Sequence, residues 1–335
     1  MVSLSNWCAT FALNAAWQVT LLVAAASAAA WFLRRARPRW QHVIWIAAVG
    51  LCFFLPLATP RKAAVHSQVS LPLDQVVERV IAAGILLAAA LRATQLVRGW
   101  QCARRWRQTA QPILSLRLQD LARECRSAMS LPPIPIREVP GLPGPLTCGF
   151  RHPVILLPQA FDRHPSDDVL RAALGHEMVH IRRRDYARNL LYEALLLPLA
   201  WHPAAWYLRS AIDRTRELVC DEQTAAHILD SRRYARSLLA IAESVPASAK
   251  CQPALGVTDG GDIEFRVRRL ISAASWPLSK RLSGSILALV MFFAAVTTAA
   301  TVAVQAGWEA RDVSELGIRP RIVYPPPPPP PPPPK

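Results

Sequence analysis

The chain has 335 residues, of which 52% are hydrophobic and only 19% are charged, and its formal net charge is +16. This composition is more apolar than that of a soluble globular domain, so it indicates a membrane protein with room for about two domains. The positive charge would also suit nucleic-acid binding. However, the arginines cluster beside apolar runs, as they do on the cytoplasmic side of membrane proteins, and we expect no direct contact with nucleic acid.

The seven cysteines are irregularly spaced and include no Cys-x-x-Cys pair. This pattern argues against both a disulfide framework and a zinc cluster built from cysteines. It is typical of thiols that stay reduced in the cytosol or in a membrane.

Four apolar runs are close to the length of about 20 residues that a membrane-spanning helix requires. They are residues 11–33, 41–59, 76–97 and 284–304. The first run is followed by the basic stretch RRARPR and is preceded by no basic residue, so we interpret it as a membrane span rather than a cleaved signal peptide. The third run differs from the others because it includes Glu78, Arg79 and Arg92.

Basic residues predict the orientation of these runs, because loops rich in lysine and arginine stay in the cytoplasm. Arginines gather in segments 34–39, 98–107 and 266–281, whereas segment 60–75 contains only Arg61 and Lys62. The rule therefore places both termini outside the cytoplasm. The predicted organisation is a three-helix membrane region at 1–97, a cytoplasmic domain at 98–282, a fourth membrane helix at 283–304 and a short extracytoplasmic tail at 305–335.

The tail ends in ten consecutive prolines, which cannot pack as a helix or a strand. They are expected to form a stiff polyproline II rod of roughly 31 Å, at about 3.1 Å per residue. Such a rod could dock a periplasmic partner or act as a spacer, and it could equally be a low-complexity end without a function.

The stretch LGHEMVHIRRRD carries the most specific chemistry in the sequence. His176 and His180 are four residues apart, so on a helix their imidazoles face the same way and can converge on one zinc ion. Glu177 lies about 100° around the helix from His176, where it can serve as the general base of a metallopeptidase. The alternative is a pair of buried histidines with a purely structural role.

The sequence around this motif predicts two antiparallel helices. Asp167 and Asp168 provide the acidic first turn that favours a helix start, and no proline occurs from residue 166 to residue 197. Segment 211–229 predicts the second helix, and the stretch WHPAAW predicts the turn between the two.

A catalytic zinc site needs a third protein ligand and an open position for water. The downstream candidates are His202, Glu217, Asp221, Glu222 and His227. Glu217 and Asp221 are four residues apart, so one can bind the metal while the other orients a histidine through its free ring nitrogen. His202 precedes a proline and suits a turn. We therefore favour Glu217 as the third ligand and keep His202 as the alternative.

Several residues near the motif have more than one interpretation. Asp185 could pair with an arginine at 182–184, support the end of the site, or be a solvated charge. Cys220 adjoins Asp221, but its position on the helix favours a small packed thiol over a ligand. A donor that assists the oxyanion is left open among Tyr186, Tyr192, Tyr207 and His227.

The apolar run PVILLP, residues 153–158, predicts a short strand that is either buried or at the edge of a sheet. An edge strand near a zinc ion can hold an extended substrate by strand addition. This strand is therefore a candidate for substrate binding.

Three segments resemble the BlaR/MecR family of integral-membrane zinc metallopeptidases. They are GHEMVHIRRRDYARNL, LAWHPAAWYLRSAIDRTRELVCDEQTA and the upstream GPLTCGFRHPVILLP. The similarity is close over about residues 140–240 and loose over the four-span layout. HExxH combined with ExxCD at this separation is more specific than HExxH alone.

The resemblance implies a mainly α-helical membrane protein, with a gluzincin-like α+β zinc protease domain inserted between the third and fourth spans. It implies His176, His180 and Glu217 as ligands of one Zn²⁺ ion, Glu177 as the catalytic base, and Asp221 in support. It also implies a bacterial inner-membrane location. The implied activity is regulatory proteolysis of a cytosolic protein, such as a transcriptional repressor, and of the chain itself.

The antibiotic-sensing members of that family carry a penicillin-binding domain with a Ser-x-x-Lys nucleophile after the last span. Only about 31 residues follow residue 304 here and they lack this motif, so we expect no β-lactam sensing by acylation of this segment. Three other functions fit the sequence less well. They are a non-catalytic membrane signal transducer, a quality-control or CaaX-type zinc protease, and an envelope energy-coupling adaptor suggested by the proline rod.

Overall fold

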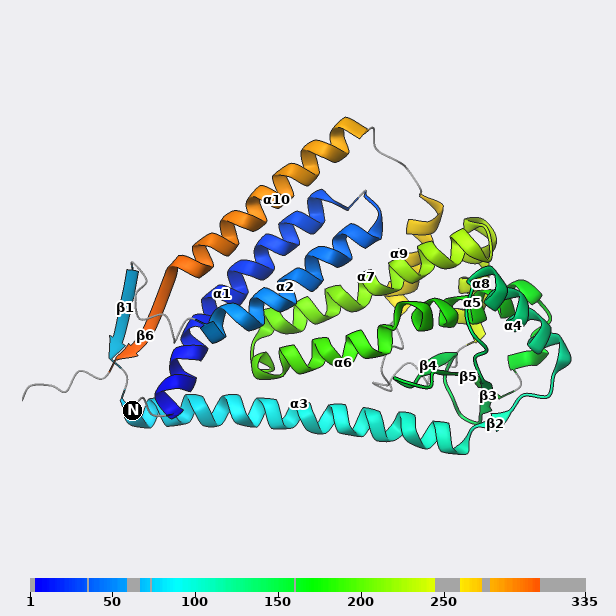
Figure 1. Ribbon diagram of the computed structural model, residues 1–335, viewed down its shortest axis with the longest axis horizontal. Coiled ribbons are helices and arrows are strands. Elements are labelled where there is room, and N and C mark those ends of the chain that lie inside the picture. The colour runs from blue at the N-terminus through cyan, green and yellow to red at the C-terminus, as the bar shows by residue number, and fades with distance from the viewer. Residues whose placement is uncertain are drawn as a thin grey trace, which may run out of the picture.

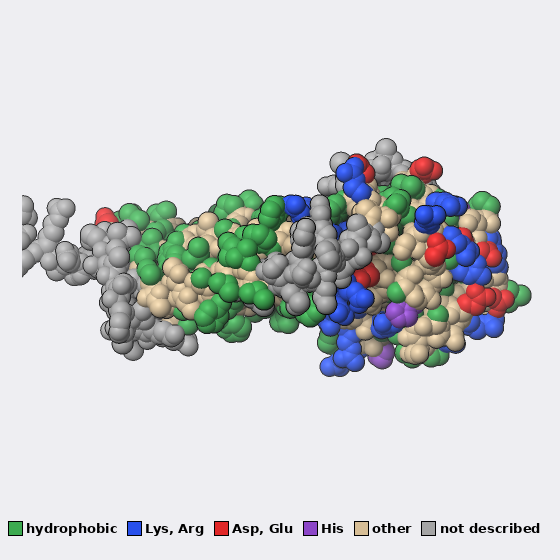
Figure 2. Space-filling model, turned by 90° about the horizontal axis from the view of Figure 1, so that it is seen from above, with side chains coloured by type: hydrophobic (Ala, Val, Ile, Leu, Met, Phe, Trp, Pro, Cys, Tyr) green, Lys and Arg blue, Asp and Glu red, His purple; other side chains and the backbone are tan. Residues whose placement is uncertain are grey.

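The computed structural model describes residues 4–34, 36–58, 67–72, 74–159, 161–244, 260–272 and 278–307. Within these ranges the molecule is mainly helical and elongated, with long helices at one end and a mixed α+β region at the other (Figure 1). The predicted proline rod lies outside the described residues. Figure 2 shows hydrophobic side chains over the long-helix end, whereas charged side chains gather over the α+β region.

Three described helices are long and apolar enough to cross a membrane, namely α1 (Leu4–Phe32), α2 (Pro38–Ala58) and α3 (Gln75–Thr109). They contain the first three predicted runs almost completely. The fourth run coincides largely with α10 (Leu278–Thr301), a helix of 24 residues that packs along α1 (Figure 1). The last residues of that run belong to strand β6 (Val302–Gly307), which pairs in parallel with β1 (Ser67–Pro72).

Two polar residues in the apolar α1 fasten this helix to α10 and β6. The Asn14 side chain donates to the carbonyl of Val304 at 2.7 Å and accepts from the amide of Val304 at 3.0 Å. The Gln18 amide donates to the carbonyl of Ala299 at 2.8 Å. Polar side chains inside apolar helices commonly serve this purpose, because in lipid they must find partners within the protein.

The predicted boundary between residues 97 and 98 falls inside a continuous helix, because α3 extends to Thr109. The arginines that begin at Arg98 change the surface of α3 from apolar to basic, but arginine is a good helix former and the backbone continues unbroken. The far end of α3 therefore reaches the α+β region (Figure 1).

A four-stranded sheet with the order β2-β3-β5-β4 forms one side of the α+β region. Its strands are β2 (Gln111–Pro112), β3 (Ile136–Val139), β4 (Leu146–Cys148) and β5 (Val154–Pro158). The strand predicted at 153–158 is β5, which is buried and has neighbours on both sides, so the alternative of an edge position is wrong. The edge strand next to it is β4, which is too short and too polar to stand out in the sequence.

Helices cover the rest of this region. They are α4 (Leu116–Ala128), α5 (Asp167–Arg183), α6 (Asp185–Leu196), α7 (Pro203–His227), α8 (Ser231–Ser244) and α9 (Gly260–Ile271), with short 3-10 turns at Phe161–Arg163 (η2) and Leu197–Leu199 (η3). The single helix expected from residue 166 to 197 is interrupted at Arg184, whose φ of 56° is left-handed. No proline or glycine marks this break. The helix predicted at 211–229 is the second half of the longer α7.

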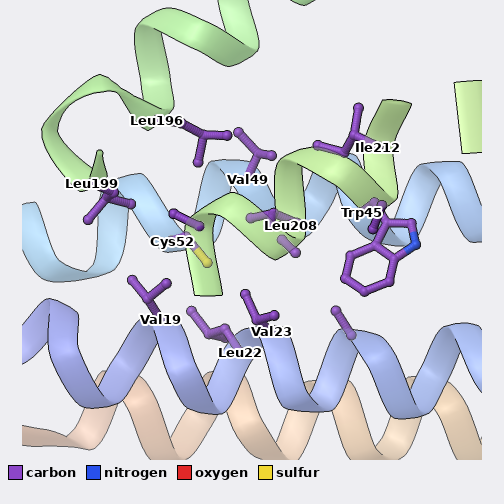
Figure 3. Close-up of a cluster of buried hydrophobic side chains, with 14 of the residues drawn as sticks. Val19, Leu22, Val23, Trp45, Val49, Cys52, Leu196, Leu199, Leu208 and Ile212 are labelled. Carbon is purple, nitrogen blue, oxygen red and sulfur yellow. The ribbon is translucent and has the colours of Figure 1, made fainter. Parts of the chain in front are cut away.

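Two of the four apolar clusters among the described residues are the largest. One joins α1 and α2 to α6, η3 and α7, where Leu196, Leu199 and Leu208 face Val19 and Val49 (Figure 3). The other lies between the sheet and helices α4, α5 and α7, and includes Ile155, Leu170 and Leu174. Since α7 contributes to both cores, it connects the long apolar helices with the region that holds the HExxH motif.

Candidate metal centre

The HExxH motif lies on α5, and the segment with Glu217 and Asp221 lies on α7, which packs against it. Gly175 permits this close packing. A Cβ atom at this position would lie 3.0 Å from Cγ1 of Ile228 and 3.3 Å from Cγ2 of Thr224, which is closer than packed atoms normally approach. The absence of a side chain immediately before His176 therefore brings the two helices together at the motif.

His176, His180 and Glu217 form one compact group. Nε2 of His176 lies 3.1 Å from Oε2 of Glu217 and 3.2 Å from Nε2 of His180. Nε2 of His180 lies 3.8 Å from Oε1 of Glu217, and one possible ligand atom from each residue falls within 4.8 Å of the others. Two imidazoles and a carboxylate at this spacing can hold a metal ion.

The opposite ring nitrogen of His176 is held by two groups. Nδ1 lies 3.0 Å from the hydroxyl oxygen of Tyr234 and 3.3 Å from Oδ1 of Asp221, and the Tyr234 hydroxyl donates to Asp221 at 2.7 Å. A carboxylate on this nitrogen keeps the proton there and leaves Nε2 free to act as a ligand. The structure thus places Asp221 behind His176.

His180 is held in the same way by Asp185. Its Nδ1 lies 2.9 Å from Oδ2 of Asp185, which also accepts from Nε of Arg183 at 3.1 Å. The left-handed Arg184 makes this contact possible, because it ends α5 and begins α6 so that Asp185 folds back toward the last turn of α5. Asp185 therefore contacts both His180 and Arg183.

A second group that could hold a metal consists of His180, Asp185 and Cys220. The Cys220 sulfur lies 3.4 Å from Nδ1 of His180. Burial, together with the negative charges of Asp185 and Glu217, raises the pKa of Cys220 well above its usual range, which disfavours the thiolate that a metal would need. Asp185 is moreover engaged by Arg183. The group that contains Glu217 is therefore the better candidate, and Cys220 fits the packed thiol expected from the sequence.

The electrostatics of the metal-free group depend on paired charges. Burial opposes protonation of His176, but its hydrogen bonds with Asp221 and Glu217 raise its pKa to about 9. Burial likewise opposes ionisation of Glu217, yet the charge of His180 and the hydrogen bond from His176 hold its pKa well below the usual range. The pKa of Asp221 falls to about 2 despite burial, because of the charge of Arg266. The acids are therefore available as charged groups at neutral pH.

Two residues of this centre, Tyr234 and Arg266, were missed in the sequence. Arg266 on α9 is buried and donates to both oxygens of Asp221 at 2.7 Å, and its Nη1 lies 3.8 Å from Oε2 of Glu217. The signal for Arg266 is its place on a helix, since it shares one face with Ile263, Val267 and Leu270. An arginine on an apolar face indicates a buried carboxylate partner elsewhere in the chain.

Glu177 is buried, and its carboxylate makes no hydrogen bond or ion pair with any residue in the described part of the chain. Its backbone carbonyl accepts from the hydroxyl of Thr147 at 3.2 Å, which fastens the edge strand β4 to the helix of the motif. Glu177 is thus a buried acid on the same helix as His176 and His180, and its carboxylate has no partner among the described residues.

The other candidates from the sequence lie elsewhere. His202 caps the start of α7, where Nδ1 accepts from the amide of Ala204 at 3.1 Å and Nε2 donates to the carbonyl of Ala16 at 3.2 Å. Both of its ring nitrogens are therefore used, and it does not join the group. Glu222 faces Arg37, and His227 is exposed. Of the proposed donors for the oxyanion, Tyr192 is buried in the core near α1 and α2, and Tyr207 makes an edge-to-face contact with Trp45.

Comparison with known proteins agrees with this geometry. The BlaR1 peptidase M56 family matches the chain over residues 58–270, which is more than half of its length, so the chain belongs to this family. The regulatory protein BlaR1 of Bacillus licheniformis is 29% identical over 82 residues, which cover 24% of this chain and only 14% of that relative. The resemblance inferred from the sequence is thereby confirmed. Membership of this peptidase family indicates a metallopeptidase, and three of the described helices are long and apolar enough to cross a membrane.

Proposed function

We propose that this chain is a zinc endopeptidase of the gluzincin type, with His176, His180 and Glu217 as ligands of one Zn²⁺ ion and Glu177 as the catalytic base. The observation that carries the proposal is the combination of two features. Buried Glu217 and the largely buried His176 and His180 converge while hydrogen bonds fix both imidazoles from behind, and the neighbouring acid Glu177 has no side-chain partner among the described residues.

The donor set fits zinc, because two imidazoles and one carboxylate with a further open position are typical of catalytic zinc sites. Bound zinc would supply the Lewis acidity that activates water and polarises the scissile carbonyl. Glu177 would accept a proton from the attacking water and deliver it to the leaving amine. Asp221 and Asp185 would keep the Nδ1 protons of His176 and His180 in place throughout.

The edge strand β4 is our candidate for binding the substrate backbone. It lies at the edge of the described sheet, and Thr147 ties it to Glu177, so a peptide that added to this edge would pass close to the general base. Replacing Thr147 by proline should weaken peptide cleavage while zinc remains bound. Strand β5, which we first considered for this role, has no free edge.

We further propose that four helices, α1, α2, α3 and α10, cross the bacterial inner membrane, with both termini outside and the metal centre on the cytoplasmic side. Arg269 of α9 donates to backbone carbonyls in the turn between α1 and α2, which supports a common side for α9 and this basic turn. The substrate would then be a cytosolic protein of the repressor type, and the chain could also cleave itself.

The test compares the purified wild-type chain in detergent with Glu177→Gln. Both should bind about one zinc ion, and only the wild type should cleave itself or a co-expressed cytosolic protein, with a loss of activity of at least about 100-fold in the variant. Glu222→Gln is the matched control, because this carboxylate lies on α7 but faces Arg37, and it should retain activity. Zinc binding without cleavage in all three proteins would favour a non-catalytic transducer, and absence of zinc would contradict the proposed site.

A further inference from the structure

The connection between α6 and α7 enters the group of long apolar helices. We call residues 190–208, which comprise the end of α6, η3 and the start of α7, the hairpin. His202 lies at the turn of the hairpin and donates to the carbonyl of Ala16 on α1. Ala16 lies about 24 Å before Phe32, the end of α1 that precedes the basic turn, at about 1.5 Å per residue. The hydrocarbon core of a bilayer is about 30 Å thick. Even a tilted α1 therefore places this turn well within the apolar layer.

A second contact shows that the hairpin is inserted in the same direction. Glu193 of the hairpin pairs with Arg92 of α3 at 2.8 Å, and Arg92 lies about 9 Å before Arg98, the first residue of the basic segment that ends the apolar part of α3. The hairpin thus reaches past the basic ends of both α1 and α3. Its inner face joins the core that these helices share, as Leu196, Leu199 and Leu208 show in Figure 3.

The outer face of the hairpin is apolar although it is exposed. Leu190 and Leu191 on α6 are 60% and 55% exposed, and Trp206 and Tyr207 on α7 are 61% and 51% exposed. A patch of large apolar side chains would be unfavourable in water, whereas it is the normal surface of a helix in lipid. The exposed side chains of α3, such as Leu87 and Leu91, are likewise large and apolar.

Several polar groups of the hairpin find partners within the protein, as the bilayer interior favours, although Nε1 of Trp201 is buried without a partner among the described residues. Its single charged residue, Glu193, is buried between Arg92 and Arg209, which lie 2.8 Å and 2.6 Å from its carboxylate. In the turn, the amide of His202 donates to the carbonyl of Leu199 at 2.9 Å, and Nε1 of Trp206 donates to the carbonyl of Ala200 at 2.6 Å. These contacts leave the charged group and most of the polar groups of the turn paired inside the protein.

We propose that residues 190–208 form a re-entrant helical hairpin whose outer face lies against the acyl chains of the bilayer. The hairpin enters from the side that carries the HExxH motif and returns to it through α7. Glu217 is only about 14 Å along α7 from the end of the hairpin, so the metal centre lies close to the membrane surface. Peptide bonds within a short distance of the bilayer are then the ones within its reach.

The test is nitroxide scanning of the full chain in phospholipid vesicles. Single cysteines at Leu191→Cys and Trp206→Cys are introduced after the native cysteines are replaced by serine or alanine, and collision rates are measured with oxygen and with a water-soluble nickel complex. Leu87→Cys on α3 is the control for lipid contact, and Leu116→Cys on α4, which is 72% exposed, is the control for water. We expect residues 191 and 206 to match residue 87, with frequent oxygen collisions and few nickel collisions.

Two results would overturn the proposal. Nickel collisions as frequent as those at residue 116 would place the hairpin in water. Low collision rates with both reagents would mean that protein, such as a second copy of the chain, covers the patch. If the cysteine-free chain does not fold, benzoylphenylalanine at 191 or 206 in the native chain should form photo-crosslinks to phospholipid, and crosslinks only to protein would again contradict lipid contact.

Discussion

The α7 helix contacts two buried charge groups, one at each end, and they differ in what faces the carboxylate. At the hairpin, Glu193 is enclosed by Arg92 and Arg209. The two guanidinium groups occupy its oxygens, and no ring nitrogen or thiol among the described residues is close enough to form a metal site with it. Such a group neutralises a charge inside an apolar environment and has no capacity left for chemistry.

At the other end of α7, arginines also neutralise the acids, but only from one side. Arg266 holds Asp221, while Glu217 still faces the Nε2 atoms of His176 and His180. The comparison teaches that buried carboxylates paired with arginine are not by themselves signs of catalysis. Arg216 also donates to Oε1 of Glu217 at 3.3 Å, so what distinguishes the candidate metal centre is the set of imidazole nitrogens and carboxylate oxygens that converge on one another.

The largest difference between the two groups should come from replacing the glutamates. Glu217→Gln should abolish stoichiometric zinc binding, because a neutral amide is a much poorer ligand than a carboxylate. Glu193→Gln should leave the zinc content unchanged but lower the free energy of unfolding by about 1–3 kcal/mol, since Arg92 and Arg209 lose their counter-charge. Metal analysis and thermal unfolding in detergent measure both effects. Equal zinc loss in the two variants would contradict the distinction.

A smaller effect is expected at Arg266, which acts on the metal centre only through Asp221 and Glu217. Arg266→Gln should lower zinc affinity by about 10–100-fold, as changes behind a ligand usually do. Arg268→Gln on the same helix is the matched control, because Arg268 is exposed and, among the described residues, forms its ion pair with Glu264. Chelator competition gives the affinities, and unchanged affinity in Arg266→Gln would show that Asp221 needs no arginine.

The dependence of zinc binding on pH should reflect the protonation of His176 at the metal-centre end of α7. The pKa of His176 is raised from 6.5 to about 9 in the metal-free protein, so zinc must displace its proton. Affinity should rise about tenfold per pH unit from pH 6.5 to 9. Over the same window the metal-free protein should lose the stability that the protonated His176 contributes below pH 6.5. Titration with a chelator at each pH checks the first trend, and a flat profile would contradict it.

The smallest expected effect is at Arg184, where the left-handed backbone costs about 1 kcal/mol for a residue with a Cβ atom. Arg184→Gly should be neutral or slightly stabilising in thermal unfolding, and zinc binding should persist because Asp185 keeps its place beside His180. Arg184→Pro, which cannot adopt a positive φ, should by contrast disrupt the contact between Asp185 and His180. Loss of zinc in the glycine variant would indicate that the Arg184 side chain itself is needed.

Local rules predicted a large part of the molecule from the sequence. Apolar length located the long helices, and the spacing of His176 and His180 by four residues placed both imidazoles on one face of α5. Proline after His202 indicated a turn, and the preference for Glu217 over His202 agrees with the group that the structure brings together. Each of these inferences depends on the periodicity of one helix or on the chemistry of a few adjacent residues.

Tertiary structure decided what depends on contacts between distant segments. Tyr234 and Arg266 reach the metal centre because α8 and α9 pack against α5 and α7, and no local pattern connects these residues to His176. No proline or glycine in the sequence predicts the helix break at Arg184. The contact between Asp185 and His180, which exists only in the folded chain, stabilises the break instead.

The sequence by itself therefore determined the apolar helices, the zinc-type motif and the family, because periodicity, composition and motif spacing are properties of short segments. Only the folded chain determined that β4 rather than β5 is the free strand edge, and that the α6–α7 connection lies among the apolar helices. Sheet order and helix insertion depend on the free energy gained when surfaces from separate parts of the chain are buried against each other. No single segment of the sequence determines that free energy.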